Sequence, residues 1–205
     1  MQTHSILSKR STRIRIMNVV EEAIVFATNA HQGQTRKMSP IPYILHPVEV
    51  SAIIATVTDN LEVIAAGALH DTIEDCGVDP LVIREKFGPR VYALVQSETE
   101  DKYPGHPAAE TWMARKEESL MMLQNTQDIG VKMLWLGDKL SNMRSFYRAY
   151  KKIGNAFVNA LHQKDKKMHA WYYRTIAENL MELQDTAAYA EYVQLVEYVF
   201  GDCEK

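Results

Sequence analysis

Residues 61–76 have the sequence LEVIAAGALHDTIEDC. The apolar first part predicts a buried helix, which would place His70, Asp71, Glu74 and Asp75 at the edge of the core. Ionisable groups that are buried without partners cost several kcal/mol, so such a cluster normally surrounds a cation or lines a cleft. We therefore expect a bound cation beside this segment.

Helical periodicity extends over most of the chain and predicts an all-α bundle of about eight to ten helices. Asp59, followed by Glu62, resembles a capping box for the helix that begins near residue 61, and Gly77 is a good stop for it. Gly88 should interrupt the helix that begins at Pro80. The expected helices are 17–30, 47–58, 61–76, 80–88, 89–97, 108–124 and 129–150, with two or three more between 155 and 200.

Length and composition favour one globular domain. The 205 residues are 46% hydrophobic, and we expect a basic N-terminal arm (residues 1–16), one domain (17–200) and a short tail (201–205). The formal net charge of −3 argues against a nucleic-acid partner. Two cysteines without a CxxC motif suit a reducing cytoplasm, and no segment approaches the ~20 apolar residues of a membrane span. The sequence leaves homo-oligomerisation open.

Four residues are candidate metal ligands. His70 and Asp71 would be joined by His46, at the start of the preceding helix, and by Asp138, which follows an apolar run in residues 131–136. Two imidazoles and two carboxylates suit Mn²⁺, Fe²⁺ or Zn²⁺. If the helix continues through Glu74, the pairs 70/74 and 71/75 form two adjacent columns, so that one pair can bind a metal while the other meets the water or substrate beside it.

Each candidate also has a structural interpretation. A histidine before proline commonly begins a helix, and a buried aspartate commonly pairs with a lysine or arginine. Residue spacing alone leaves the metal site and these alternatives equally open. Several other residues are expected to have no role in chemistry. His31 should make a structural hydrogen bond, His162 and His169 should be exposed, and Cys76 should be a small filler at a helix end. The run 171–173 (Trp-Tyr-Tyr) is expected either to belong to the core or to form a wall of a nucleotide pocket.

Four segments together resemble one enzyme family. They are AHQGQTRK (30–37), PYILHP (42–47), LHDTIED (69–75) and GDKLSNMR (137–144). Their identity and order are similar to the RelA/SpoT-type hydrolases of the HD superfamily, and to its stand-alone small alarmone hydrolases in particular. The chain departs from the family at Cys76, where threonine is usual, and in a loop after Lys37 that is one residue longer.

The resemblance implies a fold, an activity and a set of site residues. It implies an HD-domain helical bundle with a metal site in its core, usually for Mn²⁺. It implies hydrolysis of the 3′-pyrophosphate of guanosine 3′,5′-bis(diphosphate) by a metal-activated water. The implied residues are His46, His70, Asp71 and Asp138 for the metal, Glu74 and Asp75 for catalysis, and Arg36, Lys37, Asn142 and Ser145 for the nucleotide.

Two other functions remain open at this point. One is an HD phosphohydrolase for another nucleotide, such as an adenosine alarmone, NADPH or a deoxynucleoside triphosphate. The other is a catalytically silent module that binds the nucleotide. The presence of all six candidate metal and catalytic residues favours an enzyme over the silent module.

Overall fold

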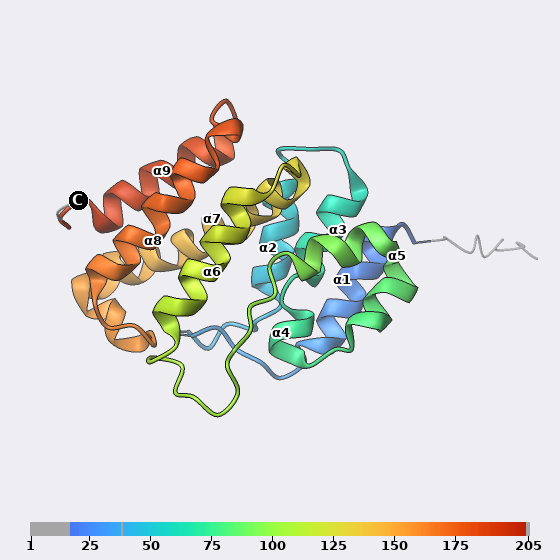
Figure 1. Ribbon diagram of the computed structural model, residues 1–205, viewed down its shortest axis with the longest axis horizontal. Coiled ribbons are helices and arrows are strands. Elements are labelled where there is room, and N and C mark those ends of the chain that lie inside the picture. The colour runs from blue at the N-terminus through green and yellow to red at the C-terminus, as the bar shows by residue number, and fades with distance from the viewer. Residues whose placement is uncertain (1–16, 38, 204–205) are drawn as a thin grey trace, which may run out of the picture.

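The computed structural model describes residues 17–37 and 39–203 and confirms the all-α prediction (Figure 1). These residues form nine α-helices and two short 3-10 segments, with one isolated bridge between Thr35 and Pro42 and no strand. The elements are α1 (Val19–Ala30), α2 (Leu45–Ile54), α3 (Leu61–Leu69), α4 (Thr72–Cys76), α5 (Pro80–Gln96), α6 (Trp112–Asn125), α7 (Ile129–Ile153), η1 (Gly154–Ala160), α8 (Lys166–Asn179), η2 (Met181–Leu183) and α9 (Ala187–Phe200).

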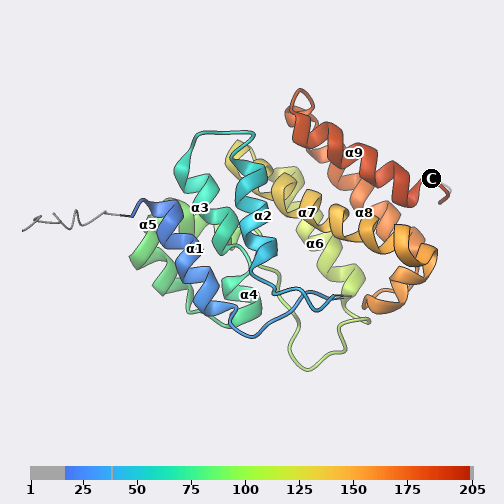
Figure 2. The same cartoon turned by 180° about the vertical axis from the view of Figure 1, so that it is seen from behind.

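The long helix α7 lies at the centre of the bundle. It packs against α2 and α3 on the side of the N-terminal helices and against α9 and η1 on the other. Figures 1 and 2 show α1, α3 and α5 grouped at one end of the molecule and α8 and α9 at the other, with α2 and α7 between them. A site built from α2, α7 and the end of α3 therefore lies between the two groups.

Two glycines allow α2 to lie close to both of its neighbours. A Cβ atom added at Gly67 of α3 would lie 2.7 Å from Cδ1 of Ile54, and one added at Gly137 of α7 would lie 2.9 Å from Cγ1 of the same side chain. Both distances are shorter than a van der Waals contact, and protein cores relax little to admit extra atoms. Glycine at these positions therefore brings the three helices that carry the candidate ligands together.

The helix over residues 61–76 is broken, which corrects the prediction of one continuous helix. Helix α3 ends at Leu69 and α4 begins at Thr72. The Thr72 hydroxyl donates to the Leu69 carbonyl at 2.7 Å, so a local side chain satisfies a backbone acceptor at the break. His70 and Asp71 therefore lie at a junction between two helices, although the carboxylates of Asp71 and Asp75 still meet at the Tyr43 hydroxyl.

Other helix boundaries differ from the prediction by up to four residues, since α2 ends at Ile54 rather than near residue 58 and α6 begins at Trp112 rather than at residue 108. Asn60, rather than Asp59, caps α3, since its side chain accepts from the backbone N–H groups of Glu62 and Val63. Gly77 ends α4 in the left-handed conformation, with φ of 66°. Helix α5 is interrupted at Gly88 (φ 87°), as predicted.

Two further sequence predictions concern the ends of the chain and membranes. The proposed basic arm, residues 1–16, lies outside the described residues, as do the last two residues of the proposed tail. Among the described helices, none combines the length and the apolar character needed to cross a bilayer.

Candidate active site

His46 lies in the first turn of α2 with its ring buried. The hydroxyl of Ser141 donates to Glu49 at 2.6 Å, so its oxygen is left to accept from Nδ1–H of His46 at 2.8 Å. The other ring nitrogen, Nε2, then carries a lone pair and lies 3.0 Å from Oδ1 of Asp138. A hydrogen bond that fixes the tautomer in this way is typical of histidines that bind metals.

His70 is oriented in the same manner at the end of α3. Its Nδ1 lies 2.9 Å from the Gly67 carbonyl oxygen, which can only accept a hydrogen bond, so Nδ1 carries the proton. Its Nε2 is buried and has no hydrogen-bond partner among the described residues. That nitrogen faces carboxylate oxygens of Asp71 at 3.0 Å and Asp138 at 3.6 Å. A buried lone pair directed at carboxylates has no stabilising partner unless a cation lies between them.

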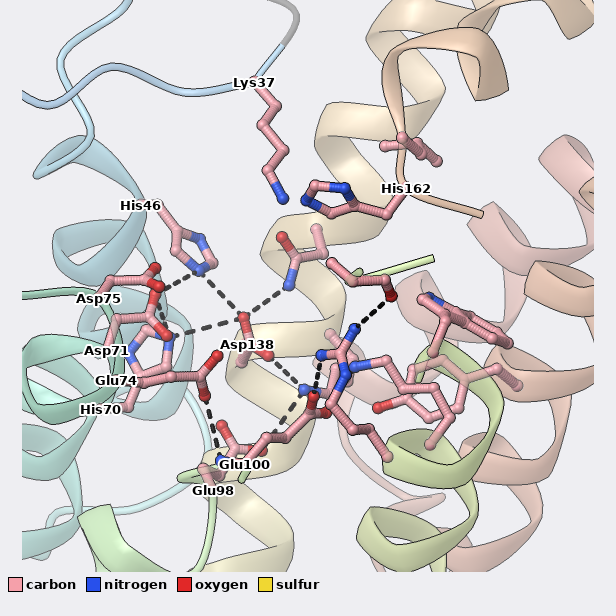
Figure 3. Close-up of a pocket in the computed structure, with 18 of the residues that line it drawn as sticks. Lys37, His46, His70, Asp71, Glu74, Asp75, Glu98, Glu100, Asp138 and His162 are labelled. Atoms are coloured by element: carbon pink, nitrogen blue, oxygen red, sulfur yellow. Dashed lines mark hydrogen bonds and ion pairs between the residues drawn. The ribbon is translucent and has the colours of Figure 1, made fainter. Parts of the chain in front are cut away.

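The candidate ligands converge on one point (Figure 3). One ligand atom each from His46, His70 and Asp138 lies within 4.8 Å of the others, and all three residues are buried. Oδ2 of Asp71 lies 3.5 Å from Nε2 of His46, so this residue adjoins the same point. The donor set fits a divalent ion of the kind that prefers imidazole and carboxylate.

The charges in the cluster are those expected of a site that could hold a cation. Burial lowers the pKa of His46, which keeps its ring neutral. Burial alone would lower the pKa of His70 too, but Asp71 and Asp138 raise it well above its usual value. Burial would raise the pKa of Asp138, yet Lys139 and the two histidines hold it well below. Two carboxylates thus remain ionised, and a divalent ion would replace the proton on His70.

Glu74 and Asp75 lie on α4 at the rim of the same cavity. Burial, followed by the charge of Asp71, raises the pKa of Glu74. Lys102 lies 2.6 Å from Oδ1 of Asp75 and 3.4 Å from Oε1 of Glu74. The Tyr43 hydroxyl donates to Asp71 at 2.7 Å and lies 3.2 Å from Asp75, so it links α4 to the candidate ligands.

Three of the four predicted nucleotide residues are joined by hydrogen bonds. Nη2 of Arg36 donates to Oδ1 of Asn142 at 2.9 Å and to the Ser145 hydroxyl at 3.3 Å. Nδ2 of Asn142 in turn donates to Asp138 at 2.7 Å, so this network is tied directly to the candidate metal site. Lys37 lines the cavity that contains the candidate metal ligands and points toward His162 (Figure 3).

The cavity has a volume of about 360 Å³ and includes residues to which the sequence analysis gave no role. Glu100, in the connection between α5 and α6, accepts from Arg115 at 2.8 Å and from Lys116 at 2.5 Å. Glu98 is buried beside Lys139, and burial raises its pKa to about 7. These pairs join residues that are more than a dozen positions apart, so no local spacing in the sequence indicates them.

The Glu100 ion pairs should stabilise the fold in a pH-dependent manner. Burial would raise the pKa of Glu100, but the neighbouring cations hold it below its usual value of 4.5. The stabilisation is therefore present above that value and is lost as the pH falls through the lower pKa of the folded state. Glu100→Gln should lower the free energy of unfolding at pH 7 by about 1.5–3 kcal/mol.

Urea unfolding at pH 7 and pH 3 measures this effect. The difference between wild type and Glu100→Gln should shrink at pH 3, which lies below the usual pKa of the carboxyl group. Glu110→Gln, at an exposed position of the same connection, is the matched control. An equal difference at both pH values would show that the charge of Glu100 does not stabilise the fold.

Aromatic residues of α8 form part of the cavity wall. Tyr172 and Tyr173 line it, and so does His169, which was predicted to be exposed but is buried. The ring of His169 packs edge-on against Trp112, with centroids 5.3 Å apart, which removes it from solvent.

Burial raises the pKa of Cys76 to about 11, which fits a structural rather than a reactive thiol.

Comparisons with known proteins identify relatives of this chain in sequence and in fold. A guanosine-3′,5′-bis(diphosphate) 3′-pyrophosphohydrolase from Vibrio cholerae is 37% identical over 132 residues, which are 63% of this chain and 18% of that protein. The chain thus spans about a fifth of the length of this relative.

Two solved structures share the fold. The crystal structure of lmo0812 from Listeria monocytogenes matches with a TM-score of 0.67 and 28% identity, over 77% of this chain and 99% of that one. A metazoan ortholog of SpoT, described as hydrolysing ppGpp, matches with a TM-score of 0.69 and 23% identity, over 90% of this chain and 96% of its own.

The profile of the HD domain family matches residues 23–163. This region contains every candidate metal, catalytic and nucleotide residue named above. It also contains α2, α3 and α7, the helices that bring the candidate ligands together. The chain therefore belongs to the HD domain family.

Proposed function

We propose that this chain is a metal-dependent pyrophosphohydrolase that removes the 3′-pyrophosphate of guanosine 3′,5′-bis(diphosphate). The observation that carries the proposal is the convergence of one imidazole nitrogen each from His46 and His70 with a carboxylate oxygen of Asp138 on one buried point, beside a carboxylate oxygen of Asp71. The similarity to the Vibrio cholerae pyrophosphohydrolase supports this choice of substrate.

The proposed ligands are His46, His70, Asp71 and Asp138, and the proposed ion is Mn²⁺. When bound, a divalent ion supplies two effects: it lowers the pKa of a water molecule and polarises a phosphoryl oxygen. The hydrogen bonds from His46 to Ser141 and from His70 to Gly67 fix the ring nitrogens that face the ion. These contacts hold the donor set in place before substrate binds.

Glu74 is the proposed general base. The pKa of Glu74 is raised toward neutral pH. A carboxylate with such a pKa accepts a proton from water more readily. Asp75 is held between Lys102 and the Tyr43 hydroxyl, and its proposed role is to orient the attacking water. Lys102 also offsets the charge of the acidic pair as the anionic substrate enters.

The proposed nucleotide contacts come from Arg36, Lys37, Asn142 and Ser145. Lys37 has no ion pair or hydrogen bond within the described part of the chain, so its ammonium group is available to a substrate phosphate. Arg36 lies 5.4 Å from the centre of the Tyr43 ring and is fixed by Asn142 and Ser145. A fixed guanidinium plane can stack on a nucleobase.

A substrate panel tests the choice of nucleotide. The purified protein with Mn²⁺ is incubated with guanosine 3′,5′-bis(diphosphate), its adenosine analogue, NADPH and a deoxynucleoside triphosphate, and the released pyrophosphate and orthophosphate are measured separately. We expect pyrophosphate release and the highest kcat/KM with the guanosine compound. Higher kcat/KM with another nucleotide would assign that substrate instead, and tight binding without any product would indicate a silent binding module.

A further inference from the structure

A second cavity, lined in part by Arg36, adjoins the first. Its volume is about 250 Å³, and it shares Lys37 and His46 with the cavity that contains the candidate metal ligands. Arg148 and Lys152 of α7 line it together with Ile41 and Leu45, two exposed apolar side chains. The two cavities are therefore neighbouring compartments that one extended ligand can occupy.

The cations of the first cavity are largely neutralised by carboxylates. The ion pairs are Lys102 with Asp75 at 2.6 Å, Lys139 with Asp138 at 2.5 Å, and Lys116 with Glu100 at 2.5 Å. Among the described lysines and arginines that line this cavity, Lys37 is the one without an ion pair to a carboxylate. This cavity therefore has little uncompensated positive charge apart from that one ammonium group and a bound metal ion.

The second cavity has the opposite balance. Four cationic side chains line it, Arg36, Lys37, Arg148 and Lys152, against one carboxylate, Glu49. That carboxylate is already used, because it accepts from Arg144 at 3.1 Å and from the Ser141 hydroxyl at 2.6 Å.

The two cations that α7 contributes to this cavity are not neutralised. Arg148 donates to the Ser145 hydroxyl at 3.0 Å, a neutral partner. Lys152 has no ion pair or hydrogen bond within the described residues. In a protein of net charge −3, an uncompensated cationic compartment indicates an anionic ligand.

The spacing of these residues along α7 gives the ligand a direction. Asn142, Ser145, Arg148 and Lys152 succeed one another at three- and four-residue intervals, so they follow one face of the helix. A rise of about 1.5 Å per residue places Lys152 roughly 15 Å along the helix from Asn142. The positive charge therefore continues away from Asp138, toward the part of the substrate that is remote from the scissile group.

We infer that Arg148 and Lys152 form a second anion subsite, which binds the 5′-phosphates of the nucleotide while its 3′-pyrophosphate lies at the metal centre. The inference rests on the proposed function and extends it. The subsite favours substrates with a longer 5′-phosphate chain, because each added phosphate brings further negative charge to Lys152.

Steady-state kinetics tests the subsite. Guanosine 3′-diphosphates that carry a 5′-mono-, di- or triphosphate are compared, and KM of the wild type should fall as the 5′ chain lengthens. Lys152→Gln should raise KM for the triphosphate form roughly three- to tenfold with kcat unchanged, as expected for binding that is equal in ground and transition states. Arg148→Gln should raise KM for both the di- and triphosphate forms.

Lys151→Gln is the matched control, because it makes the same charge change at the adjacent residue, whose ammonium group lies 3.3 Å from the Tyr198 hydroxyl. Calorimetry of the same three nucleotides with the metal-free protein gives a readout that does not require hydrolysis. If Lys152→Gln and Arg148→Gln weaken binding no more than Lys151→Gln, the subsite is overturned. If the wild type releases no pyrophosphate but its affinity depends on 5′ length through Lys152, the subsite stands and the proposed function fails.

Discussion

Asp71→Asn is expected to reduce turnover by about a thousandfold or more, which corresponds to roughly 4 kcal/mol of lost transition-state stabilisation. Asp71 places Oδ2 within 3.5 Å of both histidine nitrogens, and it is the carboxylate nearer to Nε2 of His70. The amide keeps the shape of the side chain but removes its charge, so the site loses a ligand of a divalent ion. Mn²⁺ affinity should fall together with kcat.

The measurement combines metal titration by calorimetry with initial rates at saturating Mn²⁺. Asp59→Asn is the matched control, since Asp59 is exposed and Asn60 rather than Asp59 caps α3. The control should bind metal and turn over substrate like the wild type. Metal-dependent hydrolysis at near wild-type rate in Asp71→Asn would remove this residue from the proposed ligand set.

Glu74→Gln is expected to lower kcat by about 10²–10⁴ while leaving Mn²⁺ affinity within a few fold of the wild type. Glu74 is not among the side chains that converge on the candidate ion, but it lines the same cavity. Burial raises the pKa of Glu74, which suits a general base. A metal ligand must stay ionised, and a raised pKa works against that. Metal affinity and turnover should therefore separate in this variant, unlike in Asp71→Asn.

Glu85→Gln, at an exposed position of α5, controls for the change in net charge. A second readout is the pH dependence of kcat/KM, whose acidic limb should disappear in Glu74→Gln if this carboxylate must be ionised. Loss of Mn²⁺ binding in Glu74→Gln would instead make the residue a metal ligand, and an unchanged kcat would exclude it as the base.

The sequence predicted the fold class because it depends on strong local signals, whereas the grouping of distant residues was left open by spacing alone and favoured by the family resemblance. Helical periodicity and glycine or proline boundaries are encoded within a few residues, as the interruption of α5 at Gly88 illustrates. His46 and Asp138 were proposed from their positions at a helix start and after an apolar run, and both are buried beside His70. Their roles as metal ligands stay predictions.

Features that depend on tertiary contacts were missed. The break between α3 and α4 lies where His70 is buried and faces Asp138 of α7, a contact that leaves no periodic pattern in the sequence. His169 is buried because Trp112 and Phe146, from two other helices, pack against it. Arg115 and Lys116, the cations that face Glu100, lie on α6, so the spacing of residues along the sequence could not pair them with Glu100.

The central claim is that this chain needs a divalent ion to release pyrophosphate from guanosine 3′,5′-bis(diphosphate). The most direct test is to strip the purified protein with a chelator, titrate Mn²⁺ back and measure pyrophosphate release at each concentration. We predict no release from the stripped protein and full recovery at one equivalent of bound Mn²⁺. Undiminished release from a protein shown to be metal-free, or none at saturating Mn²⁺, would contradict the account.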